Sequence, residues 1–143
     1  MKQLLLIVLL LLLFPKAVSA HTPEEVIEIA GFYADISGFD RNTIICMMLA
    51  ESGGNDQAIG DLGLSVGPWQ WTWNSWITMR RMMKMSEADL RTDPYESTNT
   101  ALFALQHGYA RMWRRACEIC GTPTKMVCYR YKDDVYCKET YGH

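Results

Sequence analysis

The chain has 143 residues and a formal net charge of −2, with 49% hydrophobic and 21% charged residues. This length suits one domain and is enough to bury most of the apolar surface in a core. The weakly acidic balance and the lack of a basic cluster argue against a nucleic-acid partner. We therefore expect a small globular protein.

The first 20 residues have the pattern of a secretory signal peptide. A charged start is followed by an apolar run over Leu4–Phe14 and by a small-residue cleavage site at Val18–Ala20. The alternative is an uncleaved membrane anchor, but a spanning helix needs about 20 apolar residues, and Pro15 follows the run directly. We expect a mature chain of residues 21–143 with a net charge of −4 and no membrane span. Its predicted location is periplasmic or extracellular.

Two helices are predicted at the start of the mature chain. Thr22–Glu25 is typical of a capping box with proline at the first helical position. Gly38 ends this helix, and Asp40 is suited to cap the next one. The second helix is almost wholly apolar over Thr43–Ala50 and ends in Glu51–Ser52.

The later segments predict a mostly helical chain with one irregular region. Residues 53–67 hold five of the ten glycines, which favours a loop or a short irregular hairpin. Trp73–Lys84 has a helical pattern, and Asp93–Pro94 begins a long helix whose apolar face continues to Trp113. Thr122–Pro123 predicts a last short helix near residues 128–131. With no repeats or linkers, we expect one α+β, mostly α-helical domain over residues 21–143.

All five cysteines lie beyond the leader. Cys117, Cys120, Cys128 and Cys137 are clustered, whereas Cys46 stands alone in the apolar run. The cluster predicts two disulfides with three possible connectivities. Zinc is the alternative, because Cys117 and Cys120 have the spacing of half a zinc ribbon, but the second pair is too far apart. We expect Cys46 to be a buried residue with the free thiol.

Glu51 is the strongest candidate for a reacting group. It ends an apolar helix and directly precedes the glycine-rich segment. A carboxyl at the edge of an apolar helix that faces a cleft has a raised pKa, because burial disfavours its charged form. A general acid that acts on an acetal oxygen near neutral pH needs this property. The alternative is a solvated glutamate at a helix end, and the helix alone favours that alternative.

The residues after Glu51 favour the catalytic interpretation of this glutamate over the solvated one. Glu51–Ser52 is followed by a polar, glycine-containing loop and then by Gly67–Gln70, a Gly-x-x-Gln motif. This order resembles the lysozyme-like lytic transglycosylases and the goose-type lysozymes. The resemblance implies a lysozyme-like fold, with a small glycine-rich loop or β region beside the catalytic helix. It also implies a substrate, the glycan strands of peptidoglycan.

Flanking segments extend this resemblance over about residues 25–132. Residues 38–40 resemble the turn before the family's catalytic helix, and residues 93–99 resemble the start of its next long helix. Val127–Tyr129 stands where the family usually has Ala-Tyr-Asn. The resemblance makes Tyr129 the tyrosine that supports the catalytic glutamate, with Tyr131 as the alternative.

The resemblance implies roles for further residues. Glu51 corresponds to the catalytic acid and base, and Ser52 to a residue that orients its carboxyl or a substrate acetamido group. Gly67 and Gln70 belong to the cleft, where Gln70 would hydrogen-bond the sugar. Trp69 lies within the same turn and is the better cleft candidate among the tryptophans, whereas we assign Trp71 to packing.

Asp61 bears on the type of reaction. Its position resembles that of a goose-type aspartate that positions the attacking water, although Thr72 replaces the second aspartate expected after Gln70. An inverting hydrolase needs a second carboxylate, whereas a lytic transglycosylase uses the muramoyl 6-hydroxyl as its nucleophile. The alternative for Asp61 is an ordinary turn residue.

We therefore expect cleavage of the β-1,4 bond between N-acetylmuramic acid and N-acetylglucosamine, with 1,6-anhydromuramoyl ends. The alternatives are a hydrolytic goose-type muramidase, a non-catalytic saccharide-binding lysozyme-like protein and a disulfide-rich interaction module. The sequence carries no motif for a metal or another cofactor, and none is expected.

Overall fold

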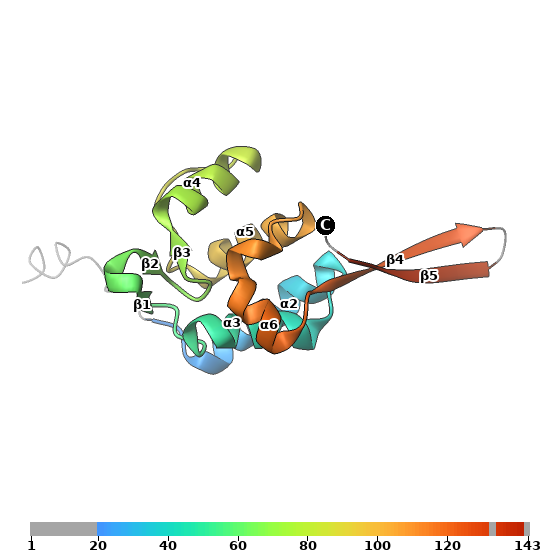
Figure 1. Cartoon of the computed structure of the whole chain (residues 1–143), viewed down its shortest axis with the longest axis horizontal. Helices are drawn as coiled ribbons and strands as arrows, with labels where there is room; N and C mark the ends of the chain where they lie inside the picture. The colour runs from blue at the N-terminus through green and yellow to red at the C-terminus, as the bar shows by residue number, and fades with distance from the viewer. Residues whose placement is uncertain (1–19, 132–133, 142–143) are drawn as a thin grey trace, which may run out of the picture.

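The computed structural model describes residues 20–131 and 134–141, with side chains as far as Thr124. Helices form most of this part of the chain (Figure 1). They are α2 (Pro23–Ser37), α3 (Arg41–Ser52), α4 (Trp73–Met82), α5 (Pro94–Gln106) and α6 (Arg114–Cys120), with 3₁₀ turns η1 (Asp61–Gly63) and η2 (Ala110–Trp113). The predicted α+β, mostly α-helical class is confirmed.

A small antiparallel sheet begins in the glycine-rich region and ends just after it. Its strands are β1 (Ile59–Gly60), β2 (Ser65–Val66) and β3 (Trp71–Thr72), hydrogen-bonded in that order. The predicted irregular hairpin is therefore confirmed, and it follows directly after α3. Since α3 ends in Glu51 and Ser52, the sheet lies beside the candidate catalytic residue.

The predicted starts of the first two helices agree with the structure. Thr22 caps α2 by accepting a hydrogen bond from the Glu25 backbone N–H at 3.2 Å, while the Glu25 carboxylate accepts one from Thr22 at 2.8 Å. Asp40 caps α3 by accepting from the Thr43 N–H at 2.7 Å. The Thr22 contacts fix where α2 begins, and the Asp40 contact fixes where α3, the helix of Glu51, begins.

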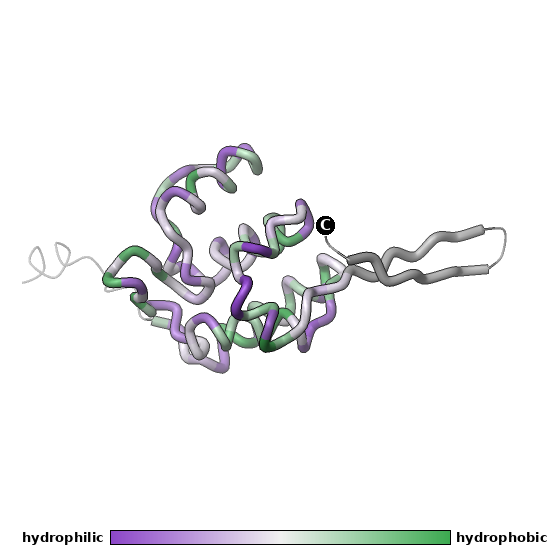
Figure 2. The backbone as a smooth tube through the Cα atoms, viewed as in Figure 1, coloured by the Kyte–Doolittle hydropathy of each residue, from purple (hydrophilic) through white to green (hydrophobic). Residues whose placement is uncertain are grey.

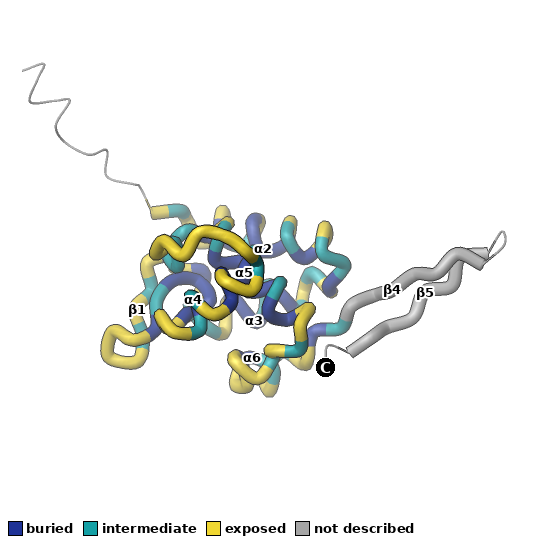
Figure 3. Tube along the Cα trace, turned by 90° about the horizontal axis from the view of Figure 1, so that it is seen from above, coloured by how far each residue is buried: buried dark blue, intermediate teal, exposed yellow. Residues whose placement is uncertain are grey.

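Tryptophans form the centre of the core. Trp69, Trp71 and Trp76 are almost fully buried, and Trp71 and Trp113 meet edge to face with their ring centres 5.1 Å apart. Each buried indole N–H has an acceptor; that of Trp69 donates to the Thr98 hydroxyl at 3.0 Å, for example. Around this cluster pack α2, α3 and α5, which carry many buried residues (Figure 3). Hydrophobic and hydrophilic residues accordingly alternate along these helices (Figure 2).

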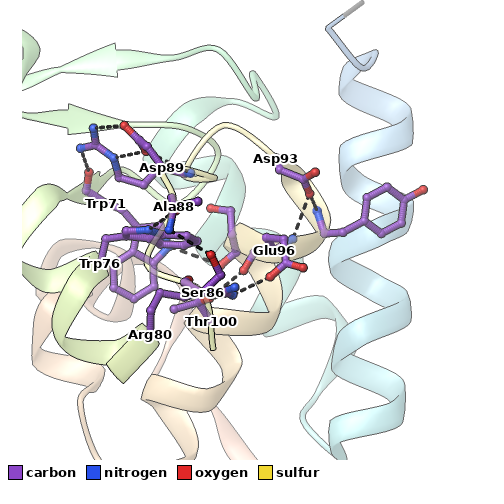
Figure 4. Close-up of polar contacts among 12 residues, drawn as sticks. Trp71, Trp76, Arg80, Ser86, Ala88, Asp89, Asp93, Glu96 and Thr100 are labelled. Carbon is purple, nitrogen blue, oxygen red and sulfur yellow. Dashed lines mark hydrogen bonds and ion pairs between the residues drawn. The ribbon is translucent and has the colours of Figure 1, made fainter. Parts of the chain in front are cut away.

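A buried arginine joins α4 to α5. Arg80 is 1% exposed and forms an ion pair with Glu96 of α5 (Figure 4). Its guanidinium also donates to the backbone oxygen of Ser86 at 2.8 Å and to the Thr100 hydroxyl at 3.3 Å, and lies over the Trp76 ring. Such a charge is tolerated in a core only because its donors are satisfied.

The predicted long helix is wrong beyond Gln106. The chain leaves the helix at His107, and Gly108 takes a left-handed conformation (φ 82°) that a residue with a side chain rarely adopts. After this break the chain forms η2 and then α6, which packs against α3. The apolar pattern continued to Trp113 because Trp113 is buried, although not on the same helix.

The predicted helix near residues 128–131 is also wrong. Strands β4 (Thr124–Tyr131) and β5 (Asp134–Tyr141) form an antiparallel hairpin that extends away from the helices (Figure 1). β-Branched and aromatic residues recur along both strands and favour extended structure. Within the described chain, every helix falls short of the length and hydropathy that crossing a bilayer requires.

Candidate active site

Glu51 lines a pocket of about 500 Å³ at the end of α3. Three parts of the chain form it, namely the end of α3, the small sheet with η1, and the η2–α6 segment. The lining residues are Ala50, Glu51, Asp61, Ser65, Gln70, Thr72, Arg111, Met112, Trp113, Arg114 and Arg115. The predicted residues Glu51, Asp61 and Gln70 therefore meet in one cavity.

The pocket favours the protonated form of Glu51. Burial raises the pKa of this carboxyl above its ordinary value, and the negative charge of Asp61 raises it further. The guanidinium of Arg115 opposes the rise but does not cancel it. The raised pKa suits a group that must donate a proton near neutral pH.

Asp61 is held in a fixed turn. It has a left-handed backbone (φ 48°), and its carboxylate accepts a hydrogen bond from the Ser65 hydroxyl at 2.7 Å. This bond joins η1 to β2 and uses one of the two carboxylate oxygens. Asp61 thus lies near enough to affect Glu51 electrostatically.

Gln70 is held in place by the small sheet. Its side-chain NH₂ donates to the backbone oxygens of Gly67 at 3.0 Å and Ala58 at 3.3 Å. A Cβ at Gly60 would lie 2.2 Å from the Gln70 side-chain oxygen, so the glycine makes room for the amide. The amide is thereby oriented before any ligand binds.

Two predicted cleft residues from the Gly-x-x-Gln turn do not line the pocket. Trp69 is fully buried, and its prediction as a cleft residue is wrong because its ring packs edge to face on Trp113. Gly67 is also buried; with φ 84° and the Arg91 backbone oxygen 1.9 Å from an ideal Cβ, it serves the turn. The tryptophan that lines the pocket is Trp113, not Trp69 as we predicted.

Ser52 does not line the pocket, and the predicted position of Tyr129 falls on residues whose side chains are not described. The Ser52 hydroxyl donates to the Met48 backbone oxygen at 3.3 Å and accepts from the Gly54 N–H at 3.2 Å, so it closes the end of α3. The backbone of Tyr129 lies in β4, and so does that of Tyr131, the alternative. Their side chains lie outside the described residues.

The η2–α6 segment supplies the pocket residues that sequence reasoning missed. They are Arg111, Met112, Trp113, Arg114 and Arg115. The signal was a run with three arginines in an acidic chain. It was overlooked because a continuous helix over this segment would not turn the run towards Glu51.

A disulfide joins Cys46 of α3 to Cys120 of α6, across a sequence separation of 74 residues. The prediction that Cys46 carries the free thiol is wrong, because α6 packs against α3. The predicted pairing of both Cys117 and Cys120 within the C-terminal cluster is wrong for the same reason, since Cys120 bonds to Cys46 and Cys117 is free. Within the side chains described, Cys117 has the free thiol, and burial raises its pKa, with the charges of Glu51 and Glu118 adding to the rise. Cys128 and Cys137 are directly opposite in the β4–β5 register, and their side chains are not described.

Fold and site together define a helical, lysozyme-like domain with a glutamate at the end of a helix beside a small sheet. The chain belongs to the transglycosylase SLT domain family, which matches residues 28–121. No curated protein and no solved structure gives a significant match. The family acts on peptidoglycan outside the cytoplasm, and the Cys46–Cys120 disulfide fits an exported protein.

Proposed function

We propose that this protein is a lytic transglycosylase that cleaves the β-1,4 bond between N-acetylmuramic acid and N-acetylglucosamine. The products would carry 1,6-anhydromuramoyl ends. The observation that carries this proposal is the Glu51 carboxyl, whose pKa is raised in a pocket shared with Gln70 and, among the described side chains, with one further carboxylate, that of Asp61.

Glu51 performs both proton transfers in this mechanism. Its protonated carboxyl gives a proton to the glycosidic oxygen as the bond from that oxygen to the muramoyl C1 breaks. The muramoyl 6-hydroxyl then attacks C1 and returns its proton to Glu51, so no water is consumed. The attacking group is already part of the substrate, which lowers the entropic barrier.

Gln70 and Asp61 have supporting roles in this proposal. The Gln70 amide uses both of its N–H groups on backbone oxygens, so in this proposal its side-chain oxygen accepts a hydrogen bond from a sugar hydroxyl. Asp61 helps to keep Glu51 protonated through its charge. Thr72 lines the pocket without a carboxylate, so the second aspartate of a goose-type site is missing from that position.

Hydrolysis by a goose-type muramidase is the second candidate, and Asp61 is the observation that favours it. Its carboxylate lines the same pocket as Glu51 and could hold a water molecule. Mass analysis of the muropeptides from purified peptidoglycan separates the two reactions, because an anhydro end is lighter by one water. Mostly reducing ends would show hydrolysis, and binding without turnover would show a non-catalytic saccharide-binding protein.

We also infer that the leader is removed after Ala20 and that residues 21–143 act in the periplasm or outside the cell. The Cys46–Cys120 bridge supports this location, since disulfides persist in oxidising compartments. N-terminal sequencing of the exported protein tests the cleavage position.

A further inference from the structure

Three arginines line the pocket of Glu51 from η2 and α6; we call Arg111, Arg114 and Arg115 the arginine wall. The other arginines with described side chains have acidic partners. Arg41 pairs with Glu28 and Asp35, while Arg80, Arg81 and Arg91 pair with Glu96, Glu87 and Asp89, respectively. Within the wall, Arg114 lies 3.6 Å from Glu118.

Arg111 and Arg115 differ from these arginines. Neither forms an ion pair with any residue in the described part of the chain, and both are exposed to the pocket. The expected mature chain is acidic, and its other described arginines are neutralised by partners. Two unpaired guanidinium groups beside the candidate catalytic carboxyl therefore indicate an anionic group on the ligand. A guanidinium matches a carboxylate in shape as well as in charge.

We propose that Arg111 and Arg115 bind a carboxylate of the substrate, so that the preferred substrate is glycan whose muramoyl residues carry acidic peptides. This inference rests on the proposed function. The N-acetylated sugar rings are uncharged, whereas the peptides attached to the lactyl groups have free carboxylates. The arginine wall thus makes Arg111 and Arg115 residues that determine specificity.

The test compares soluble peptide-bearing strands with the same strands after their carboxylates are converted to methylamides. We expect neutralisation to raise the KM of the wild type about tenfold, the size of one charge-assisted contact, with kcat little changed. Arg111→Gln should raise the KM to a similar extent on native strands and show no further rise on neutral ones. Arg81→Gln is the matched control, because Arg81 is exposed and paired with Glu87 outside the pocket.

Equal KM values of the wild type on native and neutralised strands would overturn the proposal. An Arg111→Gln variant whose KM rises by the same factor on both kinds of strand would also overturn it. Binding of the two substrates to Glu51→Gln gives the same comparison without turnover. If the wild type binds the strands in a charge-dependent way but does not cleave them, the proposed function is wrong. The arginine wall would then still be an anion-binding site.

A second observation, independent of the pocket, concerns the residue after the expected cleavage site. Asp56 is 1% exposed and lies in the loop between α3 and β1. One of its carboxylate oxygens lies 2.9 Å from the backbone nitrogen of His21 and 2.9 Å from the ring Nδ1 of the same residue. Gln57 donates to the other oxygen at 3.2 Å. Burial alone would raise the pKa of Asp56, but the hydrogen bonds from His21 and Gln57 lower it.

A buried carboxylate is stabilised best by a full positive charge that is also hydrogen-bonded. We propose that hydrolysis of the peptide bond between Ala20 and His21 supplies this charge. Water adds across the bond, Ala20 keeps the new carboxylate, and the His21 nitrogen becomes an α-ammonium group in contact with Asp56. Removal of the leader would thereby strengthen the loop that connects Glu51 to Asp61.

The test compares the mature chain that begins at His21 with the same chain preceded by Met-Ala. We expect the extension to raise the unfolding equilibrium constant about tenfold, because it replaces a charged donor with a neutral amide. In an Asp56→Asn background the same extension should have almost no effect. Acetylation of the mature α-amine, which removes its charge without a substitution, should act like the extension.

The second proposal would be overturned if the extension left the unfolding equilibrium constant unchanged. It would also be overturned if the extension raised that constant equally in the wild type and in Asp56→Asn. If Asp56→Asn does not fold, the comparison of the acetylated and unmodified mature chains replaces it. Equal stability of these two chains would overturn the second proposal. Each of these measurements concerns unfolding, so the result is independent of the proposed enzymatic activity.

Discussion

At the scale of single residues, the pocket sets the proton affinity of Glu51 through opposing charges. Asp61 raises the pKa of the carboxyl and Arg115 lowers it, while burial supplies the largest part of the rise. Sequence reasoning could single out Glu51, because a glycine-containing loop and the Gly67–Gln70 motif follow it in the order that resembles the family. It could not find Arg115, because the contact depends on how the chain turns after Gly108.

Glu51→Gln should reduce cleavage of purified peptidoglycan by about 10²–10⁴, because glutamine can neither donate nor recover the proton. The fold should be kept. Since the folded pKa of Glu51 is raised, the wild type loses stability as pH increases from the ordinary carboxyl pKa through the folded one. The variant should therefore be at least as stable at neutral pH in urea denaturation. Near-normal turnover by the folded variant would remove Glu51 from the mechanism.

Asp61→Asn and Arg115→Gln should move the pH profile of activity in opposite directions. A general acid must be protonated, so activity falls as pH rises through the pKa of Glu51. Loss of the Asp61 charge lowers this pKa and moves the alkaline limb to lower pH, whereas loss of the Arg115 charge moves the limb to higher pH. Profiles of kcat/KM on soluble strands test both variants. Shifts of the same sign would contradict the electrostatic account.

At the scale of elements, the starts of α2, α3 and α5 were predictable from the sequence, whereas the packing of helices against one another was not. Thr22, Asp40 and Asp93 cap helices through contacts with residues two or three positions away, so a short stretch of sequence contains the information. The Cys46–Cys120 bridge depends on α6 packing against α3, which no local pattern specifies. The β4–β5 hairpin was missed because Thr122–Pro123 looked like a helix start.

Replacing both Cys46 and Cys120 by alanine should destabilise the domain by about 2–4 kcal/mol. The bridge holds α6, and with it the arginine wall, against the helix of Glu51. We therefore expect activity to fall more steeply on mild heating than it does in the wild type, followed by denaturant unfolding and turnover together. Cys117→Ala is the control, because Cys117 has a free thiol and should change stability little. A double variant as stable as the wild type would show that the helix packing alone suffices.

Removing the two partners of the ion pair between α4 and α5, one at a time, should destabilise the protein to different extents. Glu96→Gln leaves the guanidinium of Arg80 buried with reduced compensation and should cost about 3 kcal/mol. Arg80→Met should cost less, since the Glu96 side chain is 33% exposed and can be hydrated. Urea denaturation of the two variants gives the comparison, and the reverse order would contradict this reading of the burial.

At the scale of the whole molecule, the family match and the geometry define the same unit. The match ends at residue 121, directly after α6 and its disulfide, and the hairpin lies beyond it. The overall class was predictable, and so was the meeting of Glu51, Asp61 and Gln70 in one pocket, because the three follow one another in the order that resembles the family. Trp69 was misplaced, since one tryptophan in a turn can face either the core or the solvent, and packing decides which.

A chain that ends at Thr124 should keep the fold and the activity. Strands β4 and β5 pair with each other along their whole length, and the hairpin extends away from the helices. We expect unfolding within about 1 kcal/mol of the full chain, as for changes remote from a core, and an unchanged kcat. Lost turnover in a truncated chain of normal stability would return Tyr129 or Tyr131 to the catalytic site.

The separation of 74 residues between Cys46 and Cys120 also fixes an order of events. On a chain that emerges with its N-terminus first, Cys46 appears long before its partner, together with the helix that carries Glu51. The covalent loop can close only when nearly the whole family-matched segment has emerged. The two walls of the pocket are therefore tied together late, and the Glu51 pocket is completed only after most of the chain has emerged.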